Sequence, residues 1–161
     1  MKISRFLAYA TLAGSLMLGT AAMAADPHAH AAGHDGHGEA GLTLDHGKMW
    51  QTDAPLRAGM TEIRTAVATS LDPIHAGKFN PSDFDALAGR IEGQIDMITK
   101  SCHLPEQADA QLHIVLAQII DGIGGMRGQS GARIDGAVAV IKALDAYGRH
   151  FTHKGWQPIT H

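Results

Sequence analysis

Residues 82–127 read SDFDALAGRIEGQIDMITKSCHLPEQADAQLHIVLAQIIDGIGGMR, and a proline near the middle divides this stretch into two parts. Apolar residues recur every three or four positions in both parts, which is the periodicity of a helix with a buried face. They are Phe84, Leu87, Ile91, Ile95, Ile98 and Cys102, then Leu112, Val115, Leu116, Ile119, Ile120, Ile123 and Met126. The pattern predicts helices over 82–103 and 105–127, joined by a tight turn, with the second helix the more buried.

Two further segments, 53–72 and 130–154, carry the same periodicity on either side of this pair. The expected N-caps of the first, second and fourth segments are Asp53, Ser82 and Ser130. The first segment is expected to close at Asp72-Pro73. No stretch alternates apolar and polar residues between hairpin turns. Four helices of similar length with short loops predict an all-α protein, an antiparallel up-down-up-down four-helix bundle.

Composition limits the classes of function. The 161 residues allow one domain, and the formal charge of −3 excludes a general basic nucleic-acid binder. A single cysteine excludes an internal disulfide framework and a four-cysteine zinc site. The 11 histidines and 7 methionines are, with that cysteine, the nitrogen and sulfur donors that soft and borderline metal ions prefer.

Residues 1–24 have the pattern of a signal peptide. Lys2 and Arg5 precede an apolar run over 6–17, and Ala22-Met23-Ala24 is a small-residue cleavage site. This pattern predicts export to the periplasm, with no membrane attachment after cleavage. We therefore divide the chain into a signal peptide (1–24), a histidine-rich arm (25–48) and a four-helix bundle domain (49–161).

The arm reads ADPHAHAAGHDGHGEAGLTLDHGK and shows neither helical nor strand periodicity. Its composition predicts disorder, because it offers too few apolar residues to build a core. The candidate metal ligands of the arm are His28, His30, His34 and His37. Imidazoles on a flexible chain can wrap a divalent ion, although weakly, because the chain loses entropy on binding. The alternative interpretation is a soluble spacer.

A second candidate site lies within the predicted bundle. In an antiparallel arrangement, Cys102, His113, Met60 and Met97 fall in the same half of the molecule, and helical phase directs them inward. A thiolate, an imidazole and thioethers in an apolar interior favour copper, as Cu(I) or Cu(II). The alternatives are an inert thiol, a core histidine and methionines that only fill the core. His103 and His150 are expected at the rim of this site.

The four-helix plan after a signal peptide resembles the periplasmic cytochromes c-prime and the b-type four-helix cytochromes. The string Thr99-Lys100-Ser101-Cys102-His103 lacks the first cysteine of the C-x-x-C-H haem attachment motif. Two other strings, Trp50-Gln51-Thr52-Asp53-x-x-Leu56-Arg57-x-Gly59-Met60 and Cys102-His103-Leu104-Pro105-x-x-x-Asp109-Ala110-x-Leu112-His113, resemble segments of small exported bacterial proteins. This resemblance implies a haem-free relative of the cytochrome bundles with a copper site.

The sequence therefore predicts a periplasmic copper-binding protein for sequestration, delivery or electron transfer, whose partners are copper ions and a periplasmic metal donor or acceptor protein. One alternative is a b-type haem electron carrier, with Met60 and His150 as axial ligands. The other is a metal-free interaction or sensor module. No enzymatic activity is predicted, because no nucleophile and base occur in a persuasive pattern. Helix faces rich in glycine and alanine also allow a homodimer.

Overall fold

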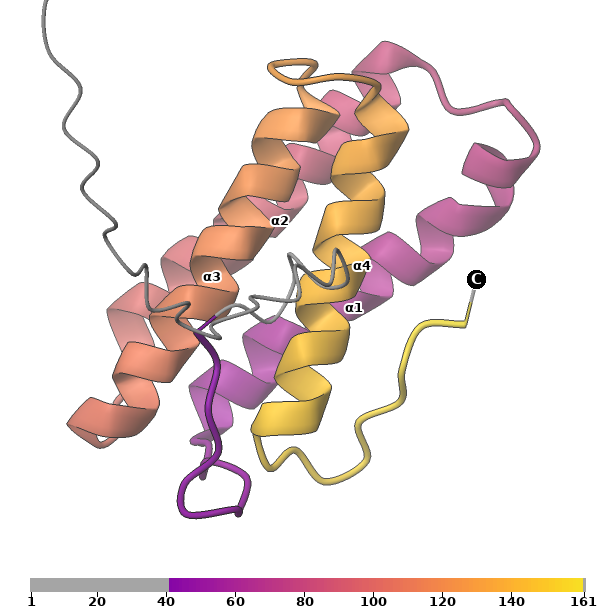
Figure 1. The fold of residues 1–161 in the computed structure, drawn as a ribbon. Helices are drawn as coiled ribbons and strands as arrows, with labels where there is room; N and C mark the ends of the chain where they lie inside the picture. Colours follow the sequence, from indigo (N-terminus) through magenta and orange to yellow (C-terminus); the bar gives the residue numbers. More distant parts are fainter. Residues whose placement is uncertain (1–40, 161) are drawn as a thin grey trace, which may run out of the picture. The chain divides into compact units, whose positions relative to one another are not determined.

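The computed structural model describes residues 41–160, which form four helices and no strand. The helices are α1 (Ala54–His75), α2 (Pro81–Ser101), α3 (Glu106–Met126) and α4 (Arg133–His150). Helix α3 packs most extensively on α4, and α1 packs on α2, while contacts of α2 with α3 and of α1 with α4 join the two pairs (Figure 1). The all-α prediction is confirmed, and the arrangement is consistent with a four-helix bundle. None of the four helices is long and apolar enough to span a membrane.

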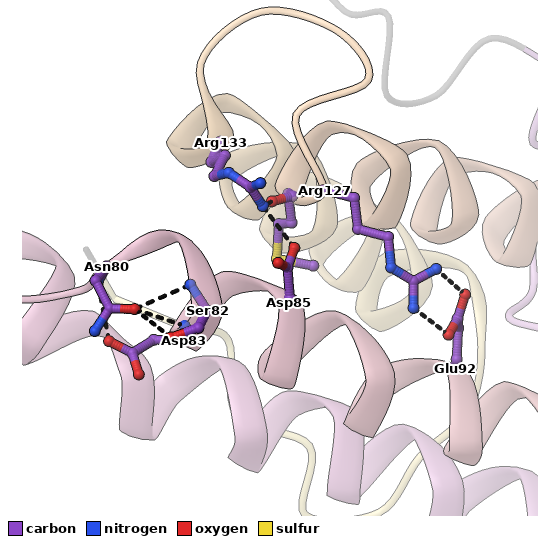
Figure 2. Close-up of polar contacts among 8 residues, drawn as sticks. Asn80, Ser82, Asp83, Asp85, Glu92, Arg127 and Arg133 are labelled. Carbon is purple, nitrogen blue, oxygen red and sulfur yellow. Dashed lines mark hydrogen bonds and ion pairs between the residues drawn. The ribbon is translucent and has the colours of Figure 1, made fainter.

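Helix α2 begins earlier than expected, because Asn80 rather than Ser82 is its N-cap. The Asn80 side chain accepts hydrogen bonds from the N–H groups of Ser82 (2.9 Å) and Asp83 (3.2 Å), and the Asp83 carboxylate accepts one from the Asn80 N–H (2.9 Å; Figure 2). This reciprocal capping box satisfies N–H groups that the helix itself cannot pair. Pro81 fits the first turn, where its missing N–H costs nothing.

Two other helix ends also differ from the expectation. Helix α1 continues through Pro73 to His75. A proline in the last turn removes only one intrahelical hydrogen bond, so the helix does not have to end before it. Helix α4 begins at Arg133 rather than at Ser130 and ends at His150 rather than at residue 154. Gly128 and Gly131 adopt φ angles of 77° and 67°, so the residues around Ser130 form a turn before α4.

Helices α3 and α4 approach each other closely through glycines. Gly136 of α4 lies against Gly122 and Gly125 of α3, and a Cβ atom at Gly136 would collide with the backbone of α3. The largest fully buried side chains pack around this pair and across to α1 and α2: Leu56, Met60, Ile63, Val67, Ile91, Ile98, Val115, Ile119, Met126, Leu144, Tyr147 and Phe151. Small residues at the α3–α4 contact therefore let the larger side chains meet in one core.

Two ion pairs join α2 to the α3–α4 turn (Figure 2). Both guanidinium arms of Arg127 donate to the carboxylate of Glu92. Arg133 donates to Asp85 (2.6 Å) and to the main-chain carbonyl of Met126 (2.6 Å). These contacts join α2 to the end of α3 and the start of α4, in addition to the core that all four helices share.

Residues 41–48 have a defined structure, so the prediction that the disordered arm extends to residue 48 is wrong for this part. Asp45 and Lys48 exchange two main-chain hydrogen bonds of 2.8 Å across His46-Gly47, whose φ angles are 49° and 83°. Positive φ at both central residues is the geometry of a type I′ turn. The main-chain N–H of Trp50 then donates to the carbonyl of His150 (2.8 Å), which joins this segment to the end of α4.

Candidate metal centre

Cys102 is half-buried at the C-terminal end of α2, where the backbone leaves the helix with an extended conformation. Its thiol forms a hydrogen bond to the carboxylate of Asp53, the N-cap of α1. Burial, the charge and hydrogen bond of Asp53, and the charge of Asp109 raise the pKa of Cys102 to about 12. Cys102 is therefore a neutral thiol at physiological pH, and a metal ion can bind the sulfur only by displacing the proton.

Asp53 connects three parts of this end of the molecule. Its carboxylate accepts hydrogen bonds from the N–H groups of Leu56 in α1 (2.9 Å) and His103 after α2 (2.6 Å), besides that of the Cys102 thiol. Burial raises the pKa of Asp53, but the hydrogen bonds from His103, Leu56 and Cys102 together outweigh burial and keep the pKa below its ordinary value. The sequence indicated Asp53 only as a helix cap, because nothing local points to its contact with Cys102.

His113 lies on the solvent side of α3, so the prediction that its side chain points inward is wrong. Its side chain is 69% exposed, and Ile120 on the same side is 51% exposed. Its Nδ1–H donates to the main-chain carbonyl of Asp109 (2.9 Å), and the Asp109 carboxylate is 3.4 Å from the same nitrogen. The imidazole is therefore available to a ligand from solvent without unfolding of the core.

The two candidate methionines lie further along α1 and α2 than Cys102, away from the end of the bundle that holds the thiol. Met60 is fully buried in the core, seven positions after Asp53, which corresponds to roughly 10 Å along the axis of α1. Met97 is half-buried, and its terminal methyl group packs against α1 at Gly59. The structure thus brings the two methionines to neighbouring positions in the α1–α2 interface, while the thiol lies at the end of the bundle.

Three histidines hold one ring nitrogen in the same way. The Nδ1 atoms of His103, His113 and His150 are 3.0, 2.9 and 2.8 Å from the main-chain carbonyls of Ser101, Asp109 and Ala146. A carbonyl oxygen only accepts, so each Nδ1 carries a proton, and in the neutral form of the ring Nε2 carries the lone pair. Metal-binding histidines commonly show this arrangement, with one nitrogen held by a carbonyl and the other left for the ion.

No three histidine, cysteine, aspartate or glutamate side chains within residues 41–160 converge as a ready metal site. The feature that Cys102 and His113 share is Asp109, which raises the pKa of the thiol and lies beside the ring. Its position four residues before His113 on one helix is the sequence signal that indicates this contact. This end of the bundle therefore provides separate donors around one carboxylate.

The candidate arm ligands His28, His30, His34 and His37 lie outside the described residues, but the structure shows where the arm joins the domain. The N–H of Thr43 donates to the side chain of Gln111 on α3 (2.7 Å), and Gly41 lies beside Ile114, the residue after His113. Four extended residues span at most about 14 Å, which exceeds the roughly 10–12 Å width of a helix. The chain is therefore long enough to bring His37 to the His113 ring.

No family model, curated protein or solved structure shows a significant match to this chain. The resemblance to haem-free relatives of the four-helix cytochromes accordingly stays a prediction. The functional assignment below depends on the donors and contacts described above.

Proposed function

We propose that this protein is an exported, periplasmic copper-binding protein, which holds copper for sequestration, delivery or electron transfer rather than for catalysis. Cys102 supplies a thiolate and His113 an imidazole, the two donor types that copper prefers. The observation that carries the proposal is the position of Asp109, whose charge raises the pKa of Cys102 and whose carboxylate lies 3.4 Å from the His113 ring. Asp109 precedes Gln111, through which α3 contacts residue Thr43 of the histidine-rich arm. Copper ions and a periplasmic metal donor or acceptor protein are its proposed partners.

Loading this site requires two local changes. The Cys102 thiol leaves the Asp53 carboxylate as it loses its proton, and His113 turns away from Asp109 so that its ring faces the sulfur. Met97 and then Met60 are the further soft donors of the proposal, in the order of their exposure to solvent. Because binding releases the thiol proton, Cu(I) affinity rises by about tenfold per pH unit below the pKa of the thiol.

The arm acts as a collector in this proposal. Gly41 lies beside Ile114, the residue after His113, and joining two ligands through one chain raises the effective concentration of one at the other. The proposed up-down-up-down order places both groups at one end of the bundle. Two contacts support that order: His103 after α2 meets Asp53 before α1, and Gly125 near the end of α3 meets Gly136 near the start of α4.

The proposal is tested first by elemental analysis and a visible spectrum of the purified protein, which separate copper, haem and no cofactor. A Cu(I) competition titration with a chromophoric chelator then compares the wild type with Cys102→Ser. Serine keeps a hydroxyl donor for Asp53 and removes only the soft sulfur, so a loss of affinity reports on coordination rather than on folding. We expect at least about a hundredfold loss, which corresponds to roughly 2.7 kcal/mol.

His113→Asn should also weaken binding, while His75→Asn is the matched control, because His75 is an exposed histidine at the other end of α1. Deletion of 25–40 should reduce the number of ions bound and leave the tightest one. Unchanged Cu(I) affinity in Cys102→Ser would exclude the thiolate site. Loss of the tightest ion on deletion of the arm would instead assign the main site to the arm.

A further inference from the structure

Tyr147 is a fully buried phenol near the end of α4, and its hydroxyl lies 3.0 Å from Nδ1 of His153. The neighbouring contacts identify the donor. The Thr61 hydroxyl donates to the carbonyl of Arg57 (2.8 Å), so its oxygen can only accept from Nε2 of His153, which lies 3.4 Å away. The proton of the neutral imidazole is therefore on Nε2, and Nδ1 accepts the hydrogen bond from Tyr147.

Trp156 lies against this pair on the side facing solvent. Its ring centroid is 4.9 Å from that of Tyr147 and 5.1 Å from that of His153. The indole occupies the space that a side chain at Gly148 would fill, and its Nε1 is buried without a hydrogen-bond partner among the described residues. Edge-to-face and tilted ring contacts, together with the hydrogen bond from the main-chain N–H of Trp156 to the carbonyl of His153 (3.0 Å), therefore set the position of Trp156, which is partly exposed while Tyr147 is not.

We propose that Tyr147, His153 and Trp156 form a proton-coupled electron-transfer relay for one-electron oxidants that reach the protein surface. The oxidant takes one electron from the Trp156 indole and is reduced. Tyr147 then returns one electron to the indole cation, while its O–H bond breaks and the proton moves to Nδ1 of His153. The products are a neutral tyrosyl radical, an imidazolium and the restored indole. This inference does not depend on the copper site.

Three features of the cluster support electron transfer beyond simple packing. A phenol that loses an electron becomes a strong acid, so its oxidation is easiest where a base already accepts its hydrogen bond, as Nδ1 does here. The base is neutral and therefore free to take the proton, because burial and the nearby Arg57 lower the pKa of His153. The partly exposed indole gives an oxidant a point of contact that the buried phenol lacks.

The relay is tested by flash photolysis of the full chain carrying Tyr9→Phe, in which Tyr147 is the single tyrosine. A photogenerated ruthenium(III) polypyridyl complex serves as the one-electron oxidant. We expect an indole radical that decays into a tyrosyl radical, detected by transient absorption and electron paramagnetic resonance. The second step should slow in D₂O, because the phenol proton moves with the electron.

His153→Asn in the same background keeps a hydrogen-bond acceptor near the phenol but supplies no base. Formation of the tyrosyl radical should slow by at least about tenfold, which corresponds to about 1.4 kcal/mol in the barrier. Trp156→Phe should also lower the yield, whereas Trp50→Phe, at the other tryptophan, should not. A radical that stays on Trp156 without an isotope effect, or a wild-type rate in His153→Asn, would overturn the proposal.

Discussion

The Asp53 carboxylate offers the sharpest test of how this end of the bundle is held together. Asp53→Ala removes the N-cap of α1, which costs about 1 kcal/mol, and leaves the N–H of His103 without its acceptor. A hydrogen bond to a charged acceptor contributes about 1.5–3 kcal/mol when buried, and less here because Asp53 is partly exposed. The expected loss in the free energy of unfolding is about 2–3 kcal/mol.

Asp53→Asn removes the charge of this residue and one of its two backbone hydrogen bonds but keeps the helix cap. Asparagine caps helices as well as aspartate does and still accepts from the Leu56 N–H, but its amide nitrogen replaces the oxygen that accepts from His103, so stability should fall by about 1–2 kcal/mol. The negative charge beside the thiol disappears, however, and with it the second cause of the raised pKa of Cys102. The pKa should therefore move down from about 12, and Cys102 should form a thiolate at lower pH than in the wild type.

Urea unfolding of the three proteins measures the stability differences, since the midpoint shifts at constant slope when only stability changes. Alkylation of Cys102 as a function of pH measures the thiolate, because the chain contains one cysteine. The reasoning is wrong if Asp53→Asn alkylates with the wild-type pH profile, since burial alone would then raise the pKa. It is also wrong if Asp53→Ala loses less than about 0.5 kcal/mol, the range of an ordinary surface substitution.

Two further predictions concern packing and acid stability. Gly136→Ala should lower the free energy of unfolding by about 3 kcal/mol, because the new Cβ meets the backbone of α3. Gly89→Ala is the control: its new Cβ has nothing within 4 Å, so the free energy of unfolding should rise by up to about 1 kcal/mol. Thermal unfolding compares the two variants. His153 is harder to protonate in the folded state than in the unfolded one. Its contribution to stability is therefore present above pH 6.5 and lost as the pH falls below that value. In His153→Asn, the free energy of unfolding, measured with urea, should depend less on pH below 6.5.

The positions of the four helices could be predicted because they depend on local signals. Apolar spacing on both sides of Leu104-Pro105 predicts α2 and α3, and Asp53 is the N-cap that the sequence indicates for α1. Helix periodicity is repeated over many residues, so single errors do not alter the outcome. The helix ends were less accurate, since capping depends on one or two side chains, as at Asn80.

The direction of His113 could not be predicted because α3 is apolar over a wide arc. A narrow apolar stripe specifies one buried face, but a wide arc allows several rotations of the helix about its axis. The close contact with α4 at Gly122 and Gly125 selects among them, and it leaves Ile120 and His113 in solvent. The rotation therefore follows from backbone contacts between helices, which spacing within one helix does not report.

The pairing of Tyr147 with His153 was missed for a related reason. The fourth helix was expected to continue to residue 154, and on a continuous helix these two side chains would not face each other. The helix instead ends at His150, and the following residues fold back toward α1, where Arg64 donates to the carbonyl of Gln157. The contact of Arg64 with Gln157 joins residues far apart in the chain, so the path of the segment that carries His153 leaves no local pattern in the sequence.

If copper binds as proposed, the charge at this end of the bundle favours one oxidation state of the ion at the thiol. A proton and Cu(I) carry the same charge, so exchanging one for the other at Cys102 leaves the net charge at this end of the bundle unchanged. The pKa of Tyr147, which burial raises most, also responds to ionisation of Cys102, so the phenol keeps its proton in both states. A divalent ion would add one positive charge to a half-buried site. We therefore expect Cu(I) at Cys102 and Cu(II) at the exposed imidazole of His113 and at the histidines of the arm.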